Sequence, residues 1–352
     1  MIRAGLIGFG LGGRVFHAPL LSSVEGLELA AIVERTTNHA AERYPGITTY
    51  RTLDAMLADS SLSLIVVTTP NDSHFQHAKQ AIEAGKHVVV DKPMCVTSAE
   101  IAELMKLAAA RGVMLAPFHS RRWDGDFRTV KKLLHDEPLG RLVYFESTMD
   151  RWRPAPTARV PWKNDPGQGG LLLDLGTHLV DQPLALFGKP EAVAAEIRRE
   201  RDGEGASDYF SVRLRYPGFT AVLSANTLSA IERPRYHLRG TCGNYVKPGI
   251  DPQEAALSKL TRIGDGPWGQ EPVKHWGLLA VDVDGGMVTR PVEPIAGDYR
   301  GYYAAVRDAI LGKGPAPVSA IDAWRVACLL EWAEESSECR REIVCDWSGE
   351  PK

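Results

Sequence analysis

The sequence predicts an α/β protein in which a doubly wound parallel sheet is followed by a second, α+β domain. Up to about residue 120, short apolar runs alternate with helical segments, as in a parallel sheet covered by helices on both faces. Beyond residue 121, apolar residues recur at every second position, which favours an antiparallel sheet with one covered face. A length of 352 residues suits two domains, and we place them at residues 1–120 and 121–352.

The first domain is expected to contain apolar strands separated by helices. The strands are predicted at 2–7, 27–33, 62–68, 87–90 and 113–118, and the helices around 16–22, 53–59, 75–84 and 98–111. Gly85 and Gly112 can each end a helix, because glycine takes the left-handed conformation at a helix C-terminus without strain. Thr97 and Glu100 form a capping box, which predicts a helix start at Ser98.

The second domain is expected to begin with a helix around 126–135. Residues 154–169 are rich in proline and glycine and are expected to form a loop. Ser319 can cap a C-terminal helix that runs to about Glu338, with apolar residues at helical spacing. Such a stripe is typical of core packing, and this helix can pack back on the first domain. The alternating stretches expected to form the sheet are 141–151, 191–199, 207–216 and 219–229.

Composition argues against several classes of partner. The net charge is −3 and basic residues are not clustered, so the chain has no general attraction for nucleic acid or an anionic membrane surface. No apolar run reaches the roughly 18–20 residues that a membrane-spanning helix needs. The five cysteines are scattered and form no Cys-x-x-Cys pair, which favours a reduced, cytoplasmic location. We therefore expect a cytoplasmic protein whose partner is a small molecule.

A glycine pattern follows the first strand. Gly8, Gly10 and Gly13 match G-x-G-x-x-G between an expected strand and an expected helix, where glycines allow a tight turn and close backbone approach to a pyrophosphate. Glu34 lies at the end of the second strand, about 20 positions later, where an acid bonds the cofactor ribose. Together they predict a dinucleotide site whose loop consists of Gly8, Phe9, Gly10, Leu11 and Gly13.

Glu34 and Arg35 bear on which dinucleotide binds. A carboxylate at this position bonds the ribose 2′-hydroxyl of NAD, whereas a neighbouring arginine can accept the 2′-phosphate of NADP. We expect NAD or NADP, with NAD slightly favoured by Glu34 and NADP kept open by Arg35. Alternatively, both side chains pair with others and select nothing. The nicotinamide half is expected to contact the polar segment after the third strand, through Thr69, Pro70, Asn71 and His74.

Lys92 follows the apolar run Val88–Val90 in the tripeptide Asp91-Lys92-Pro93. A lysine at the carboxyl end of a buried parallel strand lies where open α/β sheets bind their ligands, and the proline makes the chain turn there. The ammonium group can polarise a hydroxyl or carbonyl group bound in the crevice. A surface or salt-bridged lysine is the alternative. We also count Asp91 and Lys92 among the candidate cofactor contacts.

A second constellation lies between Gly169 and Asp181. If this stretch is helical, Asp174 and His178 stand at positions i and i+4 on one face, and Asp181 falls near the same face. Imidazole is the usual proton acceptor near neutral pH, and a neighbouring carboxylate can tune it or bond the substrate. The alternative is a core histidine satisfied by its neighbour. No His-Glu-x-x-His or other ligand spacing predicts a metal site.

Asp91-Lys92-Pro93, Asp174-Leu-Gly-Thr-His178 and the glycine pattern together resemble the Gfo/Idh/MocA family of NAD(P)-dependent oxidoreductases, over essentially the whole chain. The resemblance implies Lys92, Asp174 and His178 as catalytic residues. It also implies an N-terminal Rossmann domain, a C-terminal domain on a large open, mostly antiparallel sheet, and a homodimer or homotetramer formed through that sheet. The family usually has glutamate before the lysine, where this chain has Asp91.

Other segments look like the branch of that family that contains the NADP-dependent scyllo-inositol dehydrogenases. That branch tends to place Ser-Arg after the second strand, where this chain has Glu34-Arg35. The resemblance implies that a cyclic polyol or sugar binds between the domains, with Arg122, Arg153 and Tyr236 as candidate contacts. Salt bridges for the two arginines and a packed ring for the tyrosine are the alternatives. The segments that carry the likeness are residues 16–20, 119–124, 151–154, 174–182 and 234–236.

The resulting hypothesis is an enzyme that transfers hydride between a carbinol carbon of an inositol-like polyol or sugar and NAD(P). In it, His178 takes the hydroxyl proton, Lys92 stabilises the oxyanion and Asp174 orients the hydroxyl group. An aldose 1-dehydrogenase or a keto-sugar reductase is the alternative among enzymes. A dinucleotide-sensing regulator without catalysis is the alternative of another class.

Overall fold

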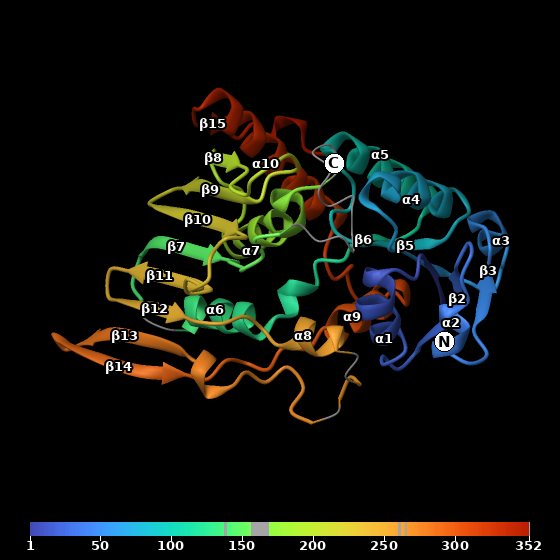
Figure 1. Ribbon diagram of the computed structural model, residues 1–352, viewed down its shortest axis with the longest axis horizontal. Helices are drawn as coiled ribbons and strands as arrows, with labels where there is room; N and C mark the ends of the chain where they lie inside the picture. Colours follow the sequence, from blue (N-terminus) through green and yellow to red (C-terminus); the bar gives the residue numbers. More distant parts are fainter. Residues whose placement is uncertain (137–138, 156–168, 260–261, 265, 352) are drawn as a thin grey trace.

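The computed structural model describes residues 1–136, 139–155, 169–259, 262–264 and 266–351. Two β-sheets lie beside each other, a parallel sheet from the first third of the chain and a larger sheet from the remainder (Figure 1). The α/β fold predicted from the sequence is confirmed. The predicted loop at 154–169 falls mostly outside the described residues.

Neighbouring strands of the smaller sheet are all parallel, in the order β3-β2-β1-β4-β5-β6. This is the order of two joined mononucleotide-binding halves, and ligands bind at the carboxyl ends of β1 and β4, where the order reverses. The strands predicted from the sequence are confirmed, and β3 is an additional short one. The bounds are β1 (Ile2–Ile7), β2 (Leu27–Val33), β3 (Thr48–Tyr50), β4 (Leu64–Val67), β5 (His87–Val90) and β6 (Leu115–Pro117).

The local signals at the helix ends of this domain are confirmed. Thr97 and Glu100 each bond the other's backbone amide, and Gly85 and Gly112 have positive φ. The first helix differs from expectation, because it begins as a π-helix immediately after the glycine loop. The helices are η1 (Gly12–His17), α1 (Ala18–Leu21), α2 (His39–Arg43), α3 (Leu53–Leu57), η2 (Asn71–Ser73), α4 (His74–Glu83) and α5 (Ser98–Arg111).

The larger sheet has the order β14-β13-β12-β11-β7-β10-β9-β8-β15. Its neighbours are antiparallel, except that β7 and β10 are parallel. The alternating stretches of the sequence became β7 to β10, and their inward residues, such as Phe210, Val212 and Leu214, are fully buried. The bounds are β7 (Leu142–Thr148), β8 (Ala192–Arg198), β9 (Tyr209–Tyr216), β10 (Phe219–Asn226), β11 (Tyr236–Gly240), β12 (Gly243–Lys247), β13 (Gly277–Val283), β14 (Gly286–Val292) and β15 (Ile343–Val344).

After the larger sheet, the chain returns to the parallel sheet. Tyr302, Tyr303 and Val306 of α9 complete the core on one face of the parallel sheet, and α10 packs against α5 on the other face as well as against α7 and β8. Ser319 caps α10 as predicted. The helices are η3 (Ser120–Trp123), α6 (Gly125–Asp136), η5 (Leu172–Gly176), α7 (Thr177–Phe187), α8 (Gln253–Ser258), η6 (Val273–His275), α9 (Arg300–Ile310), α10 (Ala320–Cys339) and η7 (Trp347–Gly349).

Candidate active site

The loop between β1 and η1 is too tight for side chains at two of its glycines. Gly8 has a φ of +92°, and a Cβ on Gly13 would lie 2.3 Å from the Gly8 carbonyl oxygen. The Thr68 hydroxyl donates to that same carbonyl at 2.8 Å and so ties the loop to the end of β4. A Cβ on Gly10 would meet no protein atom within 4 Å, so this part of the backbone is open to a ligand. The loop therefore fits a dinucleotide pyrophosphate.

Glu34 lies at the end of β2, but its carboxylate is used inside the protein. It is 5% exposed, and its two oxygens accept hydrogen bonds from the Thr37 hydroxyl at 2.7 Å and the Ala40 amide at 2.8 Å. Arg35 is exposed. The placement of Glu34 matches the alternative in which this acid pairs with its own neighbours, and the slight preference for NAD that we drew from it loses its basis.

The segment after β4 contains both exposed and internal groups. Pro70 is exposed and Asn71 is buried. The Thr69 hydroxyl contacts the His77 ring at 3.1 Å. His74 is 1% exposed, and its two ring nitrogens lie 2.7 Å from the Thr69 carbonyl and 2.8 Å from the Pro93 carbonyl. His74 thus joins this segment to the turn that follows Lys92, with both ring nitrogens engaged by backbone carbonyls.

Lys92 and Asp174 meet across the cleft between the two sheets. The Lys92 ammonium donates to the Asp174 backbone carbonyl at 2.6 Å and to its carboxylate at 2.9 Å. Lys92 follows β5, whereas Asp174 lies in η5, 82 residues further along the chain. Both side chains remain about one-fifth exposed, so a ligand can still reach them.

His178 lies in α7, one helical turn after Asp174, and the helix expected over this stretch is present. Its Nδ1 has no hydrogen-bond partner among the described residues. Burial lowers its pKa well below the usual value, and the positive charges of Lys92 and Arg121 and the ring of His119 lower it further, against the opposing effect of Asp174. The imidazole is therefore neutral near neutral pH, which is the state that accepts a proton.

Asp91 links the lysine turn to the glycine loop. Its carboxylate lies 3.6 Å from Nε2 of His17 in η1, and His17 Nδ1 in turn contacts the Tyr303 hydroxyl at 2.6 Å. Burial opposes ionisation of Asp91, but the contact with His17 and the charges of Lys92 and His74 outweigh it and lower its pKa to about 2. The sequence showed no reason to join His17 to this site, because the two residues are 74 positions apart and meet only in the fold.

The structure does not bring two of the candidate substrate contacts to the cleft. Nη2 and Nε of Arg122 donate to the Asp181 carboxylate at 2.7 and 2.9 Å. Nη1 of Arg122 lies 3.2 Å from a second carboxylate, that of Asp322. Tyr236 is fully buried, and its hydroxyl donates to Gln182 at 2.7 Å. These positions match the salt-bridge and packed-ring alternatives, because both polar groups are already satisfied by the protein.

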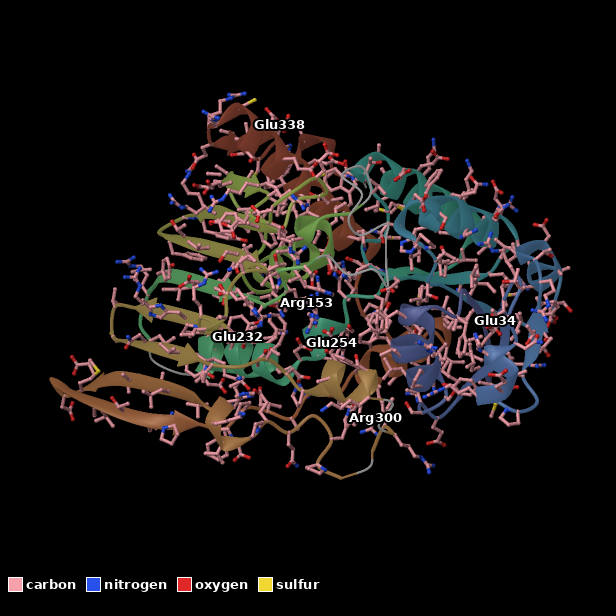
Figure 2. All side chains as sticks on the ribbon, viewed as in Figure 1. Glu34, Arg153, Glu232, Glu254, Arg300 and Glu338 are labelled. Atoms are coloured by element: carbon pink, nitrogen blue, oxygen red, sulfur yellow. The ribbon has the colours of Figure 1, made fainter. Side chains whose placement is uncertain are left out.

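A cavity of about 330 Å³ is linked to Asp174 through Arg151, and Arg153 is also among its lining residues. Its lining also includes Arg151, whose Nη1 lies 3.9 Å from the Asp174 carboxylate, and Glu254. Figure 2 shows Arg153, Glu232 and Glu254 near the middle of the molecule, and Glu34 in the parallel-sheet domain. Arg151 and Glu254 are functional candidates that sequence reasoning missed, although Arg151 belongs to a segment that carried the family likeness.

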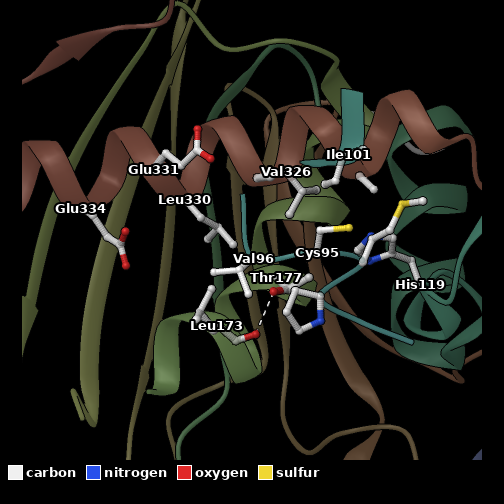
Figure 3. A pocket seen from close by; sticks show the side chains of 14 residues that line it. Cys95, Val96, Ile101, His119, Leu173, Thr177, Val326, Leu330, Glu331 and Glu334 are labelled. Carbon is white, nitrogen blue, oxygen red and sulfur yellow. Dashed lines mark hydrogen bonds between the residues drawn. The ribbon is translucent and has the colours of Figure 1, made fainter. Parts of the chain in front are cut away.

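A second cavity lies between α10, α7 and the Lys92–Pro93 turn, and Figure 3 shows His119, Thr177 and Cys95 around it. Its volume is about 30 Å³, which is the space of roughly one water molecule. Of these two cavities, only the larger has room for a substrate. Within the described ranges, no group of His, Cys, Asp and Glu could hold a metal ion, and no helix there is long and apolar enough to cross a membrane.

A glycine cradle at the switch point of a doubly wound sheet is a dinucleotide-binding arrangement, so the fold defines a protein of the NAD(P)-binding class. Comparison with protein families agrees. Residues 2–119 match the NAD-binding Rossmann fold of the Gfo/Idh/MocA oxidoreductase family, and residues 127–246 match that family's C-terminal domain. The chain belongs to the Gfo/Idh/MocA family of oxidoreductases, and the resemblance noted from its motifs is confirmed.

Similar proteins span almost the whole chain. The uncharacterized oxidoreductase YdgJ of Escherichia coli (strain K12) is 41% identical over 96% of this chain and 97% of its own. The scyllo-inositol 2-dehydrogenase (NADP(+)) IolW of Bacillus subtilis (strain 168) is 34% identical over 98% of this chain and 96% of its own. The solved structure of yvaA from Bacillus subtilis superposes with a TM-score of 0.94 at 34% identity, covering 98% of both chains.

Proposed function

We propose that this oxidoreductase transfers hydride between a carbinol carbon of a cyclic polyol or sugar and NAD(P), with Lys92, Asp174 and His178 as its catalytic residues. The observation that carries the proposal is the contact of the Lys92 ammonium with Asp174 at 2.9 Å, beside a neutral, buried His178. The family relationship supports it, because one of the similar proteins is an inositol dehydrogenase.

Each of the three side chains has a separate task in this proposal. The bound dinucleotide supplies a nicotinamide ring that accepts the hydride. The neutral imidazole of His178 accepts the hydroxyl proton, a step worth about 10²–10⁴-fold in rate. The Lys92 ammonium stabilises the negative charge that develops on the substrate oxygen. Asp174 holds that ammonium by two of its oxygens and leaves it one-fifth exposed toward the substrate.

We further propose that NADP is the preferred dinucleotide. Both carboxylate oxygens of Glu34 are occupied by hydrogen bonds within its own loop, so neither is directed at a ribose 2′-hydroxyl. The exposed guanidinium of Arg35, the residue directly after Glu34, can then bind a 2′-phosphate. The preference of the similar inositol dehydrogenase for NADP points the same way.

The test is a spectrophotometric screen at the absorbance of reduced nicotinamide, with inositols and common sugars, each offered with NAD and with NADP. We expect turnover of at least one polyol or sugar, faster with NADP. Tight dinucleotide binding without turnover of any member, in both reaction directions, would instead support the non-catalytic sensor.

A further inference from the structure

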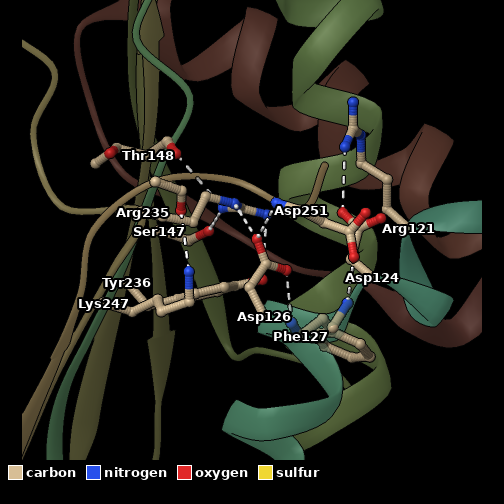
Figure 4. A network of polar contacts seen from close by, with 12 residues as sticks. Arg121, Asp124, Asp126, Phe127, Ser147, Thr148, Arg235, Tyr236, Lys247 and Asp251 are labelled. Atoms are coloured by element: carbon tan, nitrogen blue, oxygen red, sulfur yellow. Dashed lines mark hydrogen bonds and ion pairs between the residues drawn. The ribbon is translucent and has the colours of Figure 1, made fainter. Parts of the chain in front are cut away.

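Several arginines line the larger cavity, and most of them are paired with carboxylates of the protein. Asp150 accepts hydrogen bonds from Arg233 at 2.8 and 2.9 Å. Arg235, which also lines the cavity, lies 3.5 Å from Asp126 (Figure 4) and donates to Gln182 at 2.8 Å. These pairs use most of the donors and acceptors on this wall of the cavity, although the buried Nε of Arg235 has no hydrogen-bond partner among the described residues.

Three of the four acidic residues that line the cavity are engaged, and the fourth, Glu232, is exposed. Glu254 is paired with Arg121, and that positive charge lowers its pKa despite burial. Asp251 accepts hydrogen bonds from the Gly125 and Gln253 amides at 2.7 and 2.8 Å. Burial and the neighbouring Asp126 raise the pKa of Asp251 to about 6, so it carries less negative charge than an exposed carboxylate. The cavity therefore presents few carboxylates that would repel an anionic ligand.

Arg151 is the exception to this balance. Among the described residues its ion-pair partner is Asp174 at 3.9 Å, and Asp174 also receives the closer Lys92 ammonium at 2.9 Å. Burial lowers the pKa of Arg151. The nearby charges of Arg153 and Arg121 lower it further, and the carboxylates of Asp174 and Glu254 oppose this shift without cancelling it. Two cations, Lys92 and Arg151, thus contact one carboxylate, and Arg151 also lines the cavity.

A planar guanidinium in this position matches a particular ligand chemistry. Its parallel N–H groups bind carboxylate or phosphate through two hydrogen bonds, which are about twice as strong as neutral ones. A cavity of about 330 Å³ lies in the range of small-molecule sites. Arg153, also at the rim, has no hydrogen bond from its guanidinium to any residue that the structure describes. Both arginines are therefore available to one small anion.

We propose that the substrate carries an anionic group, a carboxylate or a phosphate, which docks on Arg151 while the reacting carbinol lies beside Lys92 and His178. The proposal rests on the proposed function and narrows its substrate class to acidic derivatives of polyols and sugars. The position of Arg151 beside Asp174 places that group near the reacting carbon, so the anion orients the carbinol as well as adding affinity.

The first experiment compares matched substrates that differ only in charge. Glucose, glucuronate and glucose 6-phosphate form one series, and inositol with inositol 1-phosphate forms another, each measured with saturating NADP at low and high salt. We expect at least one anionic member to exceed its neutral partner by about 10-fold in kcat/KM, and the gap to narrow in high salt. The two arms separate carboxylate from phosphate recognition.

Variants of the arginine then locate the effect. Arg151→Gln is expected to lower kcat/KM for the anionic substrate about 10-fold more than for its neutral partner, and Arg151→Lys to restore part of that difference. Arg111→Gln serves as the matched control, because Arg111 is exposed at the end of α5, far along the chain from the cavity residues. If Arg151→Gln does not fold, Arg151→Lys and Arg153→Gln provide the same comparison.

A binding measurement keeps this proposal separate from the catalytic one. Gluconate and inorganic phosphate, added to the NADP-loaded protein, should raise the melting temperature more than glucitol does, and Arg151→Gln should abolish the difference. Equal handling of charged and neutral members, insensitive to Arg151→Gln, would overturn the anion site while leaving the dehydrogenase proposal intact. Stabilisation by anions that depends on Arg151, without turnover of any substrate, would support the anion site and overturn the dehydrogenase proposal.

Discussion

The two sides of the cleft hold their ligand-facing groups by different means. On the parallel-sheet side, backbone shape dominates, since the loop from Gly8 to Gly13 leaves no room for side chains at its ends and exposes its middle. On the other side, charged side chains dominate, because Arg151 and Asp174 contact each other and Asp174 also receives Lys92 from the parallel-sheet side. The first arrangement suits a cofactor of constant shape, whereas the second can be changed residue by residue to suit a substrate.

The difference also concerns how charge is balanced. The Glu34 carboxylate is held by donors from Thr37 and Ala40, and the Asp91 carboxylate accepts from the Lys92 backbone amide at 2.8 Å with His17 nearby at 3.6 Å. Beside the cavity, Lys92 and Arg151 share Asp174, and a neutral His178 adds no further charge. An excess of positive charge at the reacting centre stabilises an oxyanion in the transition state, so the imbalance has a catalytic use.

The largest expected effect comes from removing the ammonium group of Lys92. Lys92→Met should lower kcat by about 100- to 1,000-fold, as expected for loss of an oxyanion-stabilising donor. Dinucleotide affinity should change little, because the glycine loop is held by backbone and by Thr68. Steady-state kinetics and fluorescence titration with NADP measure the two properties. Lys79→Met is the matched control, since Lys79 pairs with Glu103 on the surface of α4, and wild-type turnover by Lys92→Met would refute the catalytic assignment.

The next experiment tests the close packing of the glycine loop by replacing two of its glycines, one at a time, with alanine. Gly13→Ala places a Cβ 2.3 Å from the Gly8 carbonyl oxygen, whereas Gly10→Ala meets no protein atom within 4 Å. Overpacking of this kind costs about 1–3 kcal/mol, so Gly13→Ala should lower the melting temperature of the dinucleotide-free protein and Gly10→Ala should not. Both should weaken NADP binding, by about 10-fold or more. Equal melting temperatures for the two variants would show that the loop is not close-packed.

A third experiment examines dinucleotide choice. Arg35→Ala should reduce the ratio of kcat/KM for NADP over NAD by about 10-fold, through loss of a charge-assisted hydrogen bond to the 2′-phosphate. Glu34→Gln should leave that ratio nearly unchanged, because both oxygens of Glu34 face Thr37 and Ala40. A strong shift of the ratio toward NADP in Glu34→Gln would mean that this carboxylate does repel the phosphate.

These two sides also explain what could be predicted from the sequence. The glycine spacing, the capping box at Thr97 and the stops at Gly85 and Gly112 depend on neighbouring residues, and all were predicted. The Rossmann order and the site positions of Lys92 and Asp174 followed from strand ends and from the family likeness. NAD or NADP was predicted from Glu34 and Arg35, but the sequence could not show which side chains Glu34 pairs with, because those partners are set by how its loop folds.

The site features that could not be predicted depend on contacts between distant parts of the chain. Arg121 meets Glu254 across 133 residues, and the role of Arg151 follows from its distance to Asp174. No spacing in the sequence reports such pairs. The later strands escaped prediction for a simpler reason: β11 and β12 have five residues each, and β14 is exposed almost throughout, so the alternation of apolar and polar residues is weak there.

The buried imidazole predicts a pH dependence. Because the pKa of His178 is lowered well below 6.5, the base stays neutral as the pH falls, and the acid limb of kcat/KM for substrate oxidation should have its midpoint below pH 6.5. The same shift acts on stability. The unfolded chain takes up a proton near pH 6.5 and the folded protein does not, so unfolding becomes easier as the pH drops below that value. A midpoint at or above 6.5 that disappears in His178→Asn would contradict the described burial.

The smallest expected effect concerns Tyr236, where a substitution distinguishes a packing role from a role in substrate binding. Tyr236→Phe removes a hydroxyl that donates to Gln182 at 2.7 Å inside a fully buried cluster. Loss of this hydrogen bond should cost about 1 kcal/mol in the free energy of unfolding, while KM and kcat stay close to wild type, because the ring does not reach the cavity. Denaturant unfolding and steady-state kinetics measure the two quantities. A raised KM with unchanged stability would instead return Tyr236 to the list of substrate contacts, and would mean that the wall below Arg151 opens when substrate binds.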